Sequence, residues 1–222
     1  MTRTLRRLPG YVFLSLAAIA SVFPLYFMVV SATNTSQDVL NSRMWPGSNL
    51  LQNWADLTAA QNVGSAMWYS SINAVATTVV SLVVCSIAGY GFEVYHSRGK
   101  DRLMGLLLLA MMIPFAATMI PLFQMFATFG MVNSTFAVIL PAIATPFLVL
   151  LFRQAARSFP HEIIDAARMD GLNELNIFFR IFLPTMRSTY AAAAVITFMT
   201  AWNNFLWPKV ILVSNATRPC PC

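Results

Sequence analysis

Residues that could do chemistry are concentrated in one long polar stretch between Arg153 and Arg187. It carries acidic side chains at Glu162, Asp165 and Asp170, and long apolar segments flank it on both sides. A helical segment of this kind, presented on one face of a membrane, is suited to being gripped by a soluble partner. The stretch therefore predicts a docking surface.

A second group of polar residues lies within the apolar segments, at Asn73, Asn203 and Asn204. Amide side chains inside a membrane need hydrogen-bonding partners. Two roles stay open for them: contact with a transported substrate, and hydrogen bonding between helices, which is the favoured role.

The sequence also predicts what the chain does not do by itself. It contains no Gly-x-x-x-x-Gly-Lys-Ser/Thr pattern for cradling phosphates. Its three cysteines, Cys85, Cys220 and Cys222, lack the spacing of a metal site or a disulfide framework. We expect no catalytic residue, no metal and no cofactor, so the chain is not predicted to be an enzyme.

The composition places these residues in a membrane protein. The chain is 58% hydrophobic and 10% charged, whereas soluble domains carry about 25% charged residues. The net charge of +6 comes from basic residues at the ends of apolar segments and not on one compact face, which argues against a nucleic-acid partner. Membrane lipid is the expected surroundings.

The apolar segments predict an all-α, polytopic bundle, with residues 1–222 forming a single transmembrane domain. About 20 apolar residues are needed to cross a bilayer. Prolines should bend the third and fourth spans. Five spans are expected at about residues 11–33, 68–92, 103–129, 135–152 and 189–207, with a loop at 153–188 between the last two.

Basic residues predict the orientation. With the amino terminus in the cytoplasm, eleven of the 14 basic residues lie in cytoplasmic segments, and only Arg43, Lys209 and Arg218 lie outside. This asymmetry follows the positive-inside rule, and it places the loop at 153–188 in the cytoplasm.

Within that loop the pattern predicts two short helices. The first follows Pro160 and stops at Gly171, a residue suited to a left-handed helix end. Asn173 can cap the second. The expected apolar faces are Ile163, Ile164, Ala167 and Met169 on the first helix, and Leu175, Phe178, Phe179 and Phe182 on the second. A helix pair that merely joins two spans stays an open alternative.

The same loop resembles the permease subunits of binding-protein-dependent ABC importers. Their pattern is Glu-Ala-Ala, three residues, Gly, nine residues, then Ile-x-Leu-Pro. This chain matches every spacing with Asp165, Ala166 and Ala167, then Gly171, then Ile181, Leu183 and Pro184, and it departs only in having Asp165 in place of Glu. The resemblance implies that the loop at 159–184, including Glu162 and Asp170, couples the membrane spans to an ATPase.

Further segments are similar to the branch that imports maltose, other oligosaccharides and glycerol phosphate: 22–26, 89–92 and 201–208. The resemblance implies half of a pore for a sugar or sugar derivative in a bacterial inner membrane. It also implies a second permease subunit, two cytoplasmic ATP-binding subunits and an extracytoplasmic solute-binding protein.

Three alternatives accompany this interpretation. A secondary transporter would usually place ionisable residues within its spans, and the five predicted spans contain no mid-membrane acid or base. A membrane scaffold would need no polar pore. The third alternative is a non-functional truncated permease, because permeases of this branch have six spans. The tail from Arg218 to Cys222 matches no expected pattern, so a truncated or frameshifted chain is expected.

The orientation can be tested directly. The segment 34–67 should lie outside the cytoplasm, so a cysteine introduced as Asn49→Cys should react with an impermeant maleimide added to intact cells. Labelling that appears only after lysis would reverse the orientation.

Overall fold

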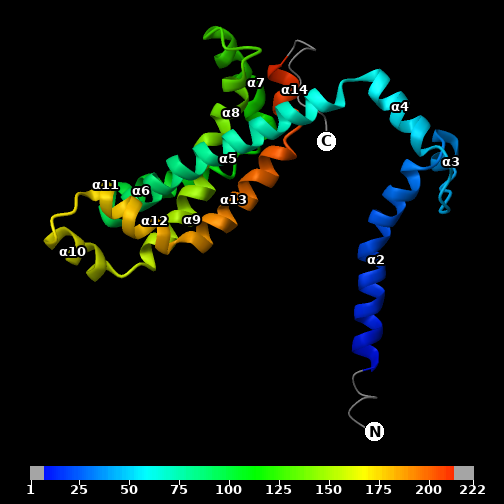
Figure 1. The fold of residues 1–222 in the computed structure, drawn as a ribbon. Helices are drawn as coiled ribbons and strands as arrows, with labels where there is room; N and C mark the ends of the chain where they lie inside the picture. Colours follow the sequence, from blue (N-terminus) through cyan, green and yellow to red (C-terminus); the bar gives the residue numbers. More distant parts are fainter. Residues whose placement is uncertain (1–7, 213–222) are drawn as a thin grey trace. The chain divides into compact units, whose positions relative to one another are not determined.

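The structure of the chain is a computed structural model that describes residues 8–212 (Figure 1). The basic residues Arg3, Arg6 and Arg7 and the tail from Arg218 lie outside the described residues. Residues 8–212 form helices, turns and loops without a strand, so the all-α fold predicted from the apolar segments is confirmed. The chain divides into two compact units, Met1–Val63 and Gly64–Cys222, and each is described by itself.

The first unit contains α2 (Leu8–Ala32), α3 (Ser36–Leu40) and α4 (Leu50–Ala60). α2 is long and apolar enough to cross a membrane, and within its unit it buries almost no side chain. Side chains around buried Asn34 join the end of α2 to the segment that follows. The Asn34 amide donates to the carbonyl of Trp45 at 3.0 Å, and Asn53 donates to Ala32 and Asn34 at 2.8 and 3.0 Å.

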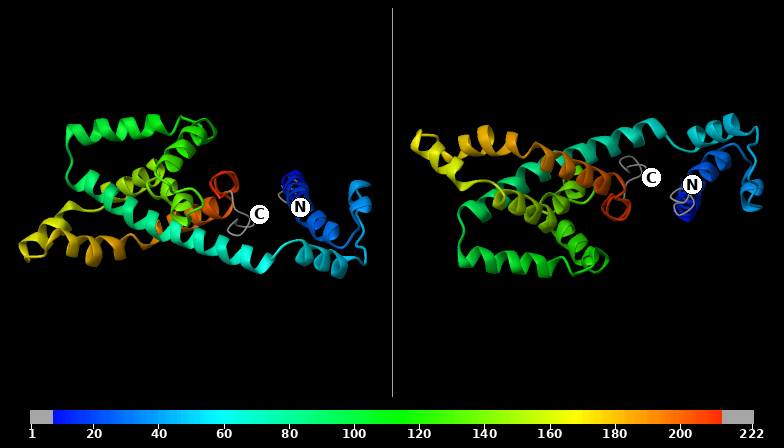
Figure 2. Two further views of the ribbon diagram at one scale, coloured as in Figure 1. Left: turned by 90° about the horizontal axis from the view of Figure 1, so that it is seen from above. Right: turned by 90° about the horizontal axis from the view of Figure 1, so that it is seen from below.

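The second unit begins with α5 (Val63–Val94), a second helix able to cross a membrane. α6 (Arg98–Ala110) and α7 (Phe115–Thr128) follow, and they meet at an angle of 102°, a sharp turn visible in Figure 2. The expected single span at 103–129 is therefore two helices. The bend lies next to Pro114, which has no N–H to continue a helix.

α8 (Thr135–Ile143) and α9 (Pro146–Arg157) form a second bent pair, at 44°. Two carbonyls lack their helical hydrogen-bond donor here. Pro141 and Pro146 have no N–H, so they cannot donate to the carbonyls of Ala137 and Ala142. Side chains of other helices replace the missing donors. The indole of Trp207 donates to the Ala137 carbonyl at 2.8 Å, and the hydroxyl of Ser81 donates to the Ala142 carbonyl at 2.9 Å.

The last described helices are α13 (Arg187–Trp202) and α14 (Leu206–Ile211). The span expected at 189–207 is thus interrupted, because Asn203 ends α13 and its amide donates back to the Met199 carbonyl at 2.8 Å. By length and composition, residues 8–212 contain two candidate spans, or four if each bent pair counts as one. α13, with 16 residues, lies below that length, so the number of five spans stays a prediction.

α5 and α9 approach each other closely at Gly89. A β-carbon built there would lie 2.6 Å from the Cβ of Phe152 and 2.7 Å from the backbone nitrogen of Arg153. Small residues allow this kind of close helix approach in membranes. Gly91, two residues later on α5, has no described atom within 4 Å of the corresponding position.

These two glycines give a matched test of the packing. Gly89→Ala should lower the stability of the protein by about 1–3 kcal/mol, because the added methyl group meets backbone that cannot rotate away. Gly91→Ala should leave it unchanged or raise it slightly. Thermal denaturation of the purified protein in detergent measures both. Equal melting temperatures for the two variants would contradict the close contact.

Candidate functional site

The segment that carries the sequence pattern, residues 159–184, is called here the motif loop. It contains four short helices, the last of which ends at Thr185. They are α10 (His161–Met169), α11 (Glu174–Ile177), the π-helix η1 (Phe178–Phe182) and α12 (Leu183–Thr185). They connect α9 to α13 at one end of the second unit, as Figure 1 shows.

Gly171 makes the turn between the two arms of the loop. Its φ is +78°, a left-handed conformation that costs other residues about 1–2 kcal/mol. The N–H of Leu172 donates to Ala167 at 3.1 Å, and that of Gly171 donates to Arg168 at 3.0 Å. This pair of bonds is the Schellman helix end. The side chain of Asn173 then caps α11 by accepting from the N–H of Asn176 at 2.8 Å.

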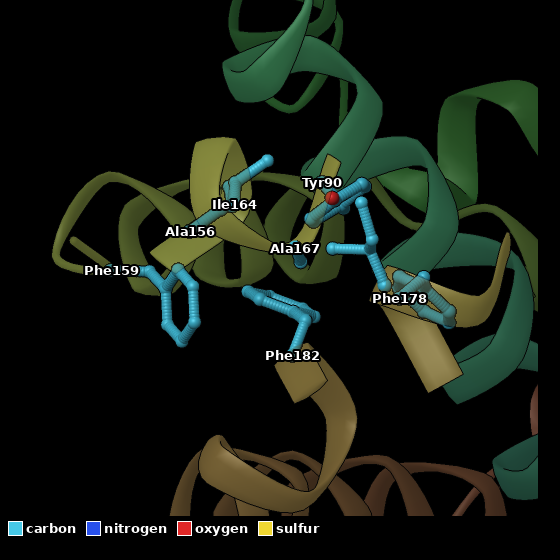
Figure 3. Close-up of a cluster of buried hydrophobic side chains, with 8 residues drawn as sticks. Tyr90, Ala156, Phe159, Ile164, Ala167, Phe178 and Phe182 are labelled. Atoms are coloured by element: carbon cyan, nitrogen blue, oxygen red, sulfur yellow. The ribbon is translucent and has the colours of Figure 1, made fainter. Parts of the chain in front are cut away.

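One side of the motif loop packs in an aromatic cluster against the ends of α5 and α9 (Figure 3). Tyr90 of α5 meets Phe182 with ring centroids 4.9 Å apart and Phe178 at 5.4 Å. Phe159, which follows α9, meets Phe182 at 5.9 Å. The members of this aromatic cluster are Tyr90, Ala156, Phe159, Ile164, Ala167, Ile177, Phe178 and Phe182.

The apolar faces differ from those expected. Ile164, Ala167, Phe178 and Phe182 are buried, but the other four residues are not. On the second arm, the π-helix widens the turn, so Ile177 and Phe182, five residues apart, share the buried side. The members of the expected apolar faces that are exposed are Ile163 (43% exposed), Met169 (89%), Leu175 (65%) and Phe179 (51%).

The other side of α10 is open to solvent. Glu162, Asp165, Ala166 and Asp170 are exposed there, beside the exposed Met169. α10 therefore presents acidic and apolar side chains together, while its buried side is fixed by the aromatic cluster. The motif residues Ile181 and Leu183 are half-buried against that cluster, and Pro184 is exposed.

Arg168 links the two arms of the loop across the turn. Its Nε lies 2.8 Å from Oε1 of Glu174, and its Nη1 lies 3.2 Å from Oδ1 of Asp165. The hydrogen bond from the Arg168 guanidinium holds the pKa of the Glu174 carboxyl below its ordinary value. Asp165 is thus held in place by a residue of its own helix, while its side chain stays 70% exposed.

A second charged group joins three helices beside the loop. Arg153 of α9 contacts Glu93 of α5 at 3.1 Å and Asp101 of α6 at 2.5 Å. The Arg153 and Glu93 side chains are largely buried, so this ion pair has little contact with solvent. The hydrogen bond from Arg153 lowers the pKa of Asp101. Among residues 8–212, no cluster of His, Cys, Asp or Glu has the arrangement of a metal site.

Away from the loop, the second unit contains a pocket of about 260 Å³. It lies where α8 breaks into α9 and where α13 gives way to α14, between these breaks and α5. Broken helices at membrane depth are tolerated where they line a cavity. Its polar lining includes Asn73, Thr77, Thr145, Thr197, Thr200 and Asn204.

The structure brings two of the three predicted asparagines together. Asn73 and Asn204 both line the pocket, whereas Asn203 lies outside its lining and ends α13. The threonines at 145, 197 and 200 were missed by the sequence analysis. For Thr197 and Thr200, the signal that could have found them is a hydroxyl or amide at every third or fourth position of α13; Thr145 lies between α8 and α9, outside that pattern.

Comparison with known proteins gives the family. Residues 81–218 match the binding-protein-dependent transport system inner membrane component family. The lactose transport system permease protein LacG of Rhizobium radiobacter is 46% identical over 98% of this chain and 81% of its own length. The chain belongs to this family of transport permeases. Membership sets aside the secondary transporter and the scaffold, and it makes the chain a multi-pass inner-membrane permease that works with other ABC components.

Other relatives extend the comparison. The arabinooligosaccharides transport system permease protein AraQ of Halalkalibacterium halodurans is 37% identical over 93% of this chain and 75% of its own length. The sn-glycerol-3-phosphate permease protein UgpE of Pectobacterium atrosepticum is 32% identical over 93% and 76%. One solved structure has the same fold: a chain in the crystal structure of a bacterial ABC transporter involved in the import of the acidic polysaccharide alginate. The TM-score is 0.81 and the sequence identity is 20%. The match covers 99% of this permease and 78% of that chain.

Substitutions at Gly171 test whether backbone strain, and not steric crowding, makes glycine necessary at this turn. No described atom lies within 4 Å of a β-carbon built there, so only the left-handed φ opposes substitution. Gly171→Asn should be tolerated, because asparagine visits this conformation readily, whereas Gly171→Val should destabilise the loop by about 2 kcal/mol. Limited proteolysis of the membrane-embedded protein near residue 171 measures the difference. Equal cleavage of the two variants would contradict this account.

Proposed function

We propose that the permease forms half of the pore of an ATP-driven carbohydrate importer and receives the motion of an ATPase through the motif loop. The observation that carries the proposal is the two-sided character of α10. Its exposed side offers Glu162, Asp165 and Met169, while Ile164 and Ala167 anchor the opposite side in the aromatic cluster. A helix that packs against the spans on one side and is exposed on the other can pass the motion of a bound partner to those spans.

The docking partner is an ATP-binding subunit, one for each of two permeases in the complex. α10 lies in a cleft on that subunit in the helix-in-groove manner. The exposed carboxylate of Asp165 faces basic residues of the cleft, and Met169 adds an adaptable apolar contact. The remaining partners are a second permease subunit and an extracytoplasmic solute-binding protein. The motif loop and the amino terminus lie in the cytoplasm, as the basic residues predict.

The path of the motion follows the contacts. When the ATPase cleft closes, α10 moves and carries the ring of Phe182, which packs on Tyr90 and Phe159. Tyr90 belongs to α5, and Phe159 directly follows α9, so both helices are displaced together. Arg153 keeps α5, α6 and α9 joined at the same end. The spans then move as one body and reshape the pocket between their broken segments.

The substrate side rests on the relatives and the pocket. LacG and AraQ are named for lactose and arabino-oligosaccharides. The polar pocket with Asn73 and Asn204 offers hydrogen-bonding groups at the interrupted helices. We assign it to the substrate path, and Asn203 to the shape of the break at the end of α13.

Docking can be tested on the exposed side of α10. Met169→Asp should abolish transport in the assembled importer and release the ATP-binding subunit in detergent, because a charge replaces the apolar contact. The permease should remain in the membrane, since Met169 is 89% exposed and supports no core. The matched control is Thr185→Ala, on an exposed residue of α12 whose hydroxyl donates only to Ile181 of the same segment.

Co-purification of the ATP-binding subunit and uptake of labelled sugar in vesicles give the two readouts. Normal co-purification and uptake by Met169→Asp would remove α10 as the docking element. Loss in Thr185→Ala as well would show that the effect is not specific to α10.

A further inference from the structure

We infer that the pocket of the second unit is a binding site for a single uncharged sugar ring, so that this permease subunit selects against anionic carbohydrates itself. The inference rests on the proposed function, and it names the substrate class and the residues that recognise it. The arrangement, polarity, charge and size of the pocket carry it.

Two helices place polar groups toward the pocket with the same spacing. On α5 these are Ser70, Asn73 and Thr77, and on α13 and the break after it they are Thr197, Thr200 and Asn204. Each set follows positions i, i+3 and i+7, which is one face of a helix. Polar side chains in membrane helices face interiors or cavities, and the two faces here line the same cavity.

Asn73 has an unmet hydrogen bond. Its Oδ1 is buried and has no partner among the described residues. A buried, unpaired polar atom costs about 1–3 kcal/mol. Rotation of the Asn73 amide toward the pocket that this residue lines would let a ligand hydroxyl donate to it and recover that cost. A sugar hydroxyl can both donate to an amide oxygen and accept from an amide nitrogen, which suits an asparagine in either orientation.

The threonines add acceptors to the pocket. The hydroxyl of Thr197 donates to the Ala193 carbonyl and that of Thr200 to the Ile196 carbonyl, each at 2.8 Å. Because each proton is used within α13, the oxygen atoms present lone pairs to a ligand. The pocket therefore prefers a ligand rich in hydroxyl donors.

Charge argues in the same direction. None of the described residues that line the pocket is Lys, Arg, Asp or Glu. A phosphate or carboxylate entering here would lose its hydration without gaining a cation, and an unpaired charge is costly in such a site. Acceptor atoms on the lining would repel it further. A neutral polyol meets neither cost.

The size suits one ring at a time. A cavity of about 150 Å³ accommodates benzene, so about 260 Å³ can hold a six-membered ring with its hydroxyl groups. Phe147 and Trp202 also line the pocket, and they offer aromatic surface to the apolar face of a sugar ring, as mostly apolar sites with a few polar groups do.

The test uses the complete importer in proteoliposomes, with its solute-binding protein and ATP, and three labelled probes: lactose, an arabino-oligosaccharide and glycerol 3-phosphate. Asn73→Leu should raise the KM for the transported neutral sugar by about tenfold, and Thr77→Val by about threefold. Thr78→Val is the matched control, because Thr78 is as buried as Thr77 but does not line the pocket. Its kinetics should be unchanged.

A second measurement does not depend on how well the Asn73 variant folds. A cysteine introduced as Thr200→Cys should react with a small thiol reagent, measured against the unsubstituted chain. During turnover, lactose should slow this reaction and glycerol 3-phosphate should not.

The outcomes separate the two proposals. An importer that moves none of the probes would refute the carbohydrate function, and this inference with it. If the importer moves lactose or the arabino-oligosaccharide but the KM is unchanged in Asn73→Leu and Thr77→Val, the pocket assignment alone is overturned. The same holds if the transported sugar does not protect the Thr200→Cys site. Transport of glycerol 3-phosphate in preference to both neutral sugars would also overturn it.

Discussion

The packing of Phe182 between Tyr90 and Phe159 is the contact on which the rest of this permease depends. It joins the motif loop to two helices from different parts of the chain, α5 and α9. Phe182 is fully buried, and removing such a ring from a core costs about 3–5 kcal/mol. The π-helix at 178–182 places both Ile177 and Phe182 on the buried side. Without this contact, the motif loop would lose its packing against α5 and α9, and the proposed transfer of motion to the spans would have no path.

The second constraint is the need to satisfy every backbone group where water is absent. Prolines interrupt α8 and the start of α9, and each leaves a carbonyl without its helical donor. Trp207 and Ser81 supply the two donors from α14 and α5. The interruption thereby becomes a stable feature that can line a pocket, and the residues that stabilise it tie α5 and α14 to the broken helices. The architecture and the pocket proposed as the substrate path thus depend on the same hydrogen bonds.

Particular residues show how far sequence reasoning reached. The all-α membrane fold followed from long apolar segments, and the turn at Gly171 followed from glycine with a capping Asn173 after it. The 3.6-residue period failed in the motif loop, because a π-helix has a wider turn, so Leu175 and Phe179 were expected on an apolar face and are exposed. Met169 was also assigned to an apolar face, and it is exposed on α10.

The site was predicted unevenly for a similar reason. Asn73 and Asn204 stood out as amides in apolar segments, but their closeness depends on the break after Asn203 and on the bend between α8 and α9. The bend follows from prolines whose presence was seen but whose geometry could not be derived, and the break at Asn203 interrupts a segment that reads as one continuous span in the sequence. Thr197 and Thr200 were missed because a threonine that bonds its own helix is common in membranes.

The central claim is that the aromatic cluster transmits work from ATP hydrolysis to the spans. The most direct measurement is the ratio of sugar transported to ATP hydrolysed in proteoliposomes containing the complete importer with Phe182→Ala. The account predicts that hydrolysis continues while transport falls by at least an order of magnitude, because α10 still docks but no longer moves α5 and α9. Transport that stays proportional to hydrolysis in this variant would contradict it.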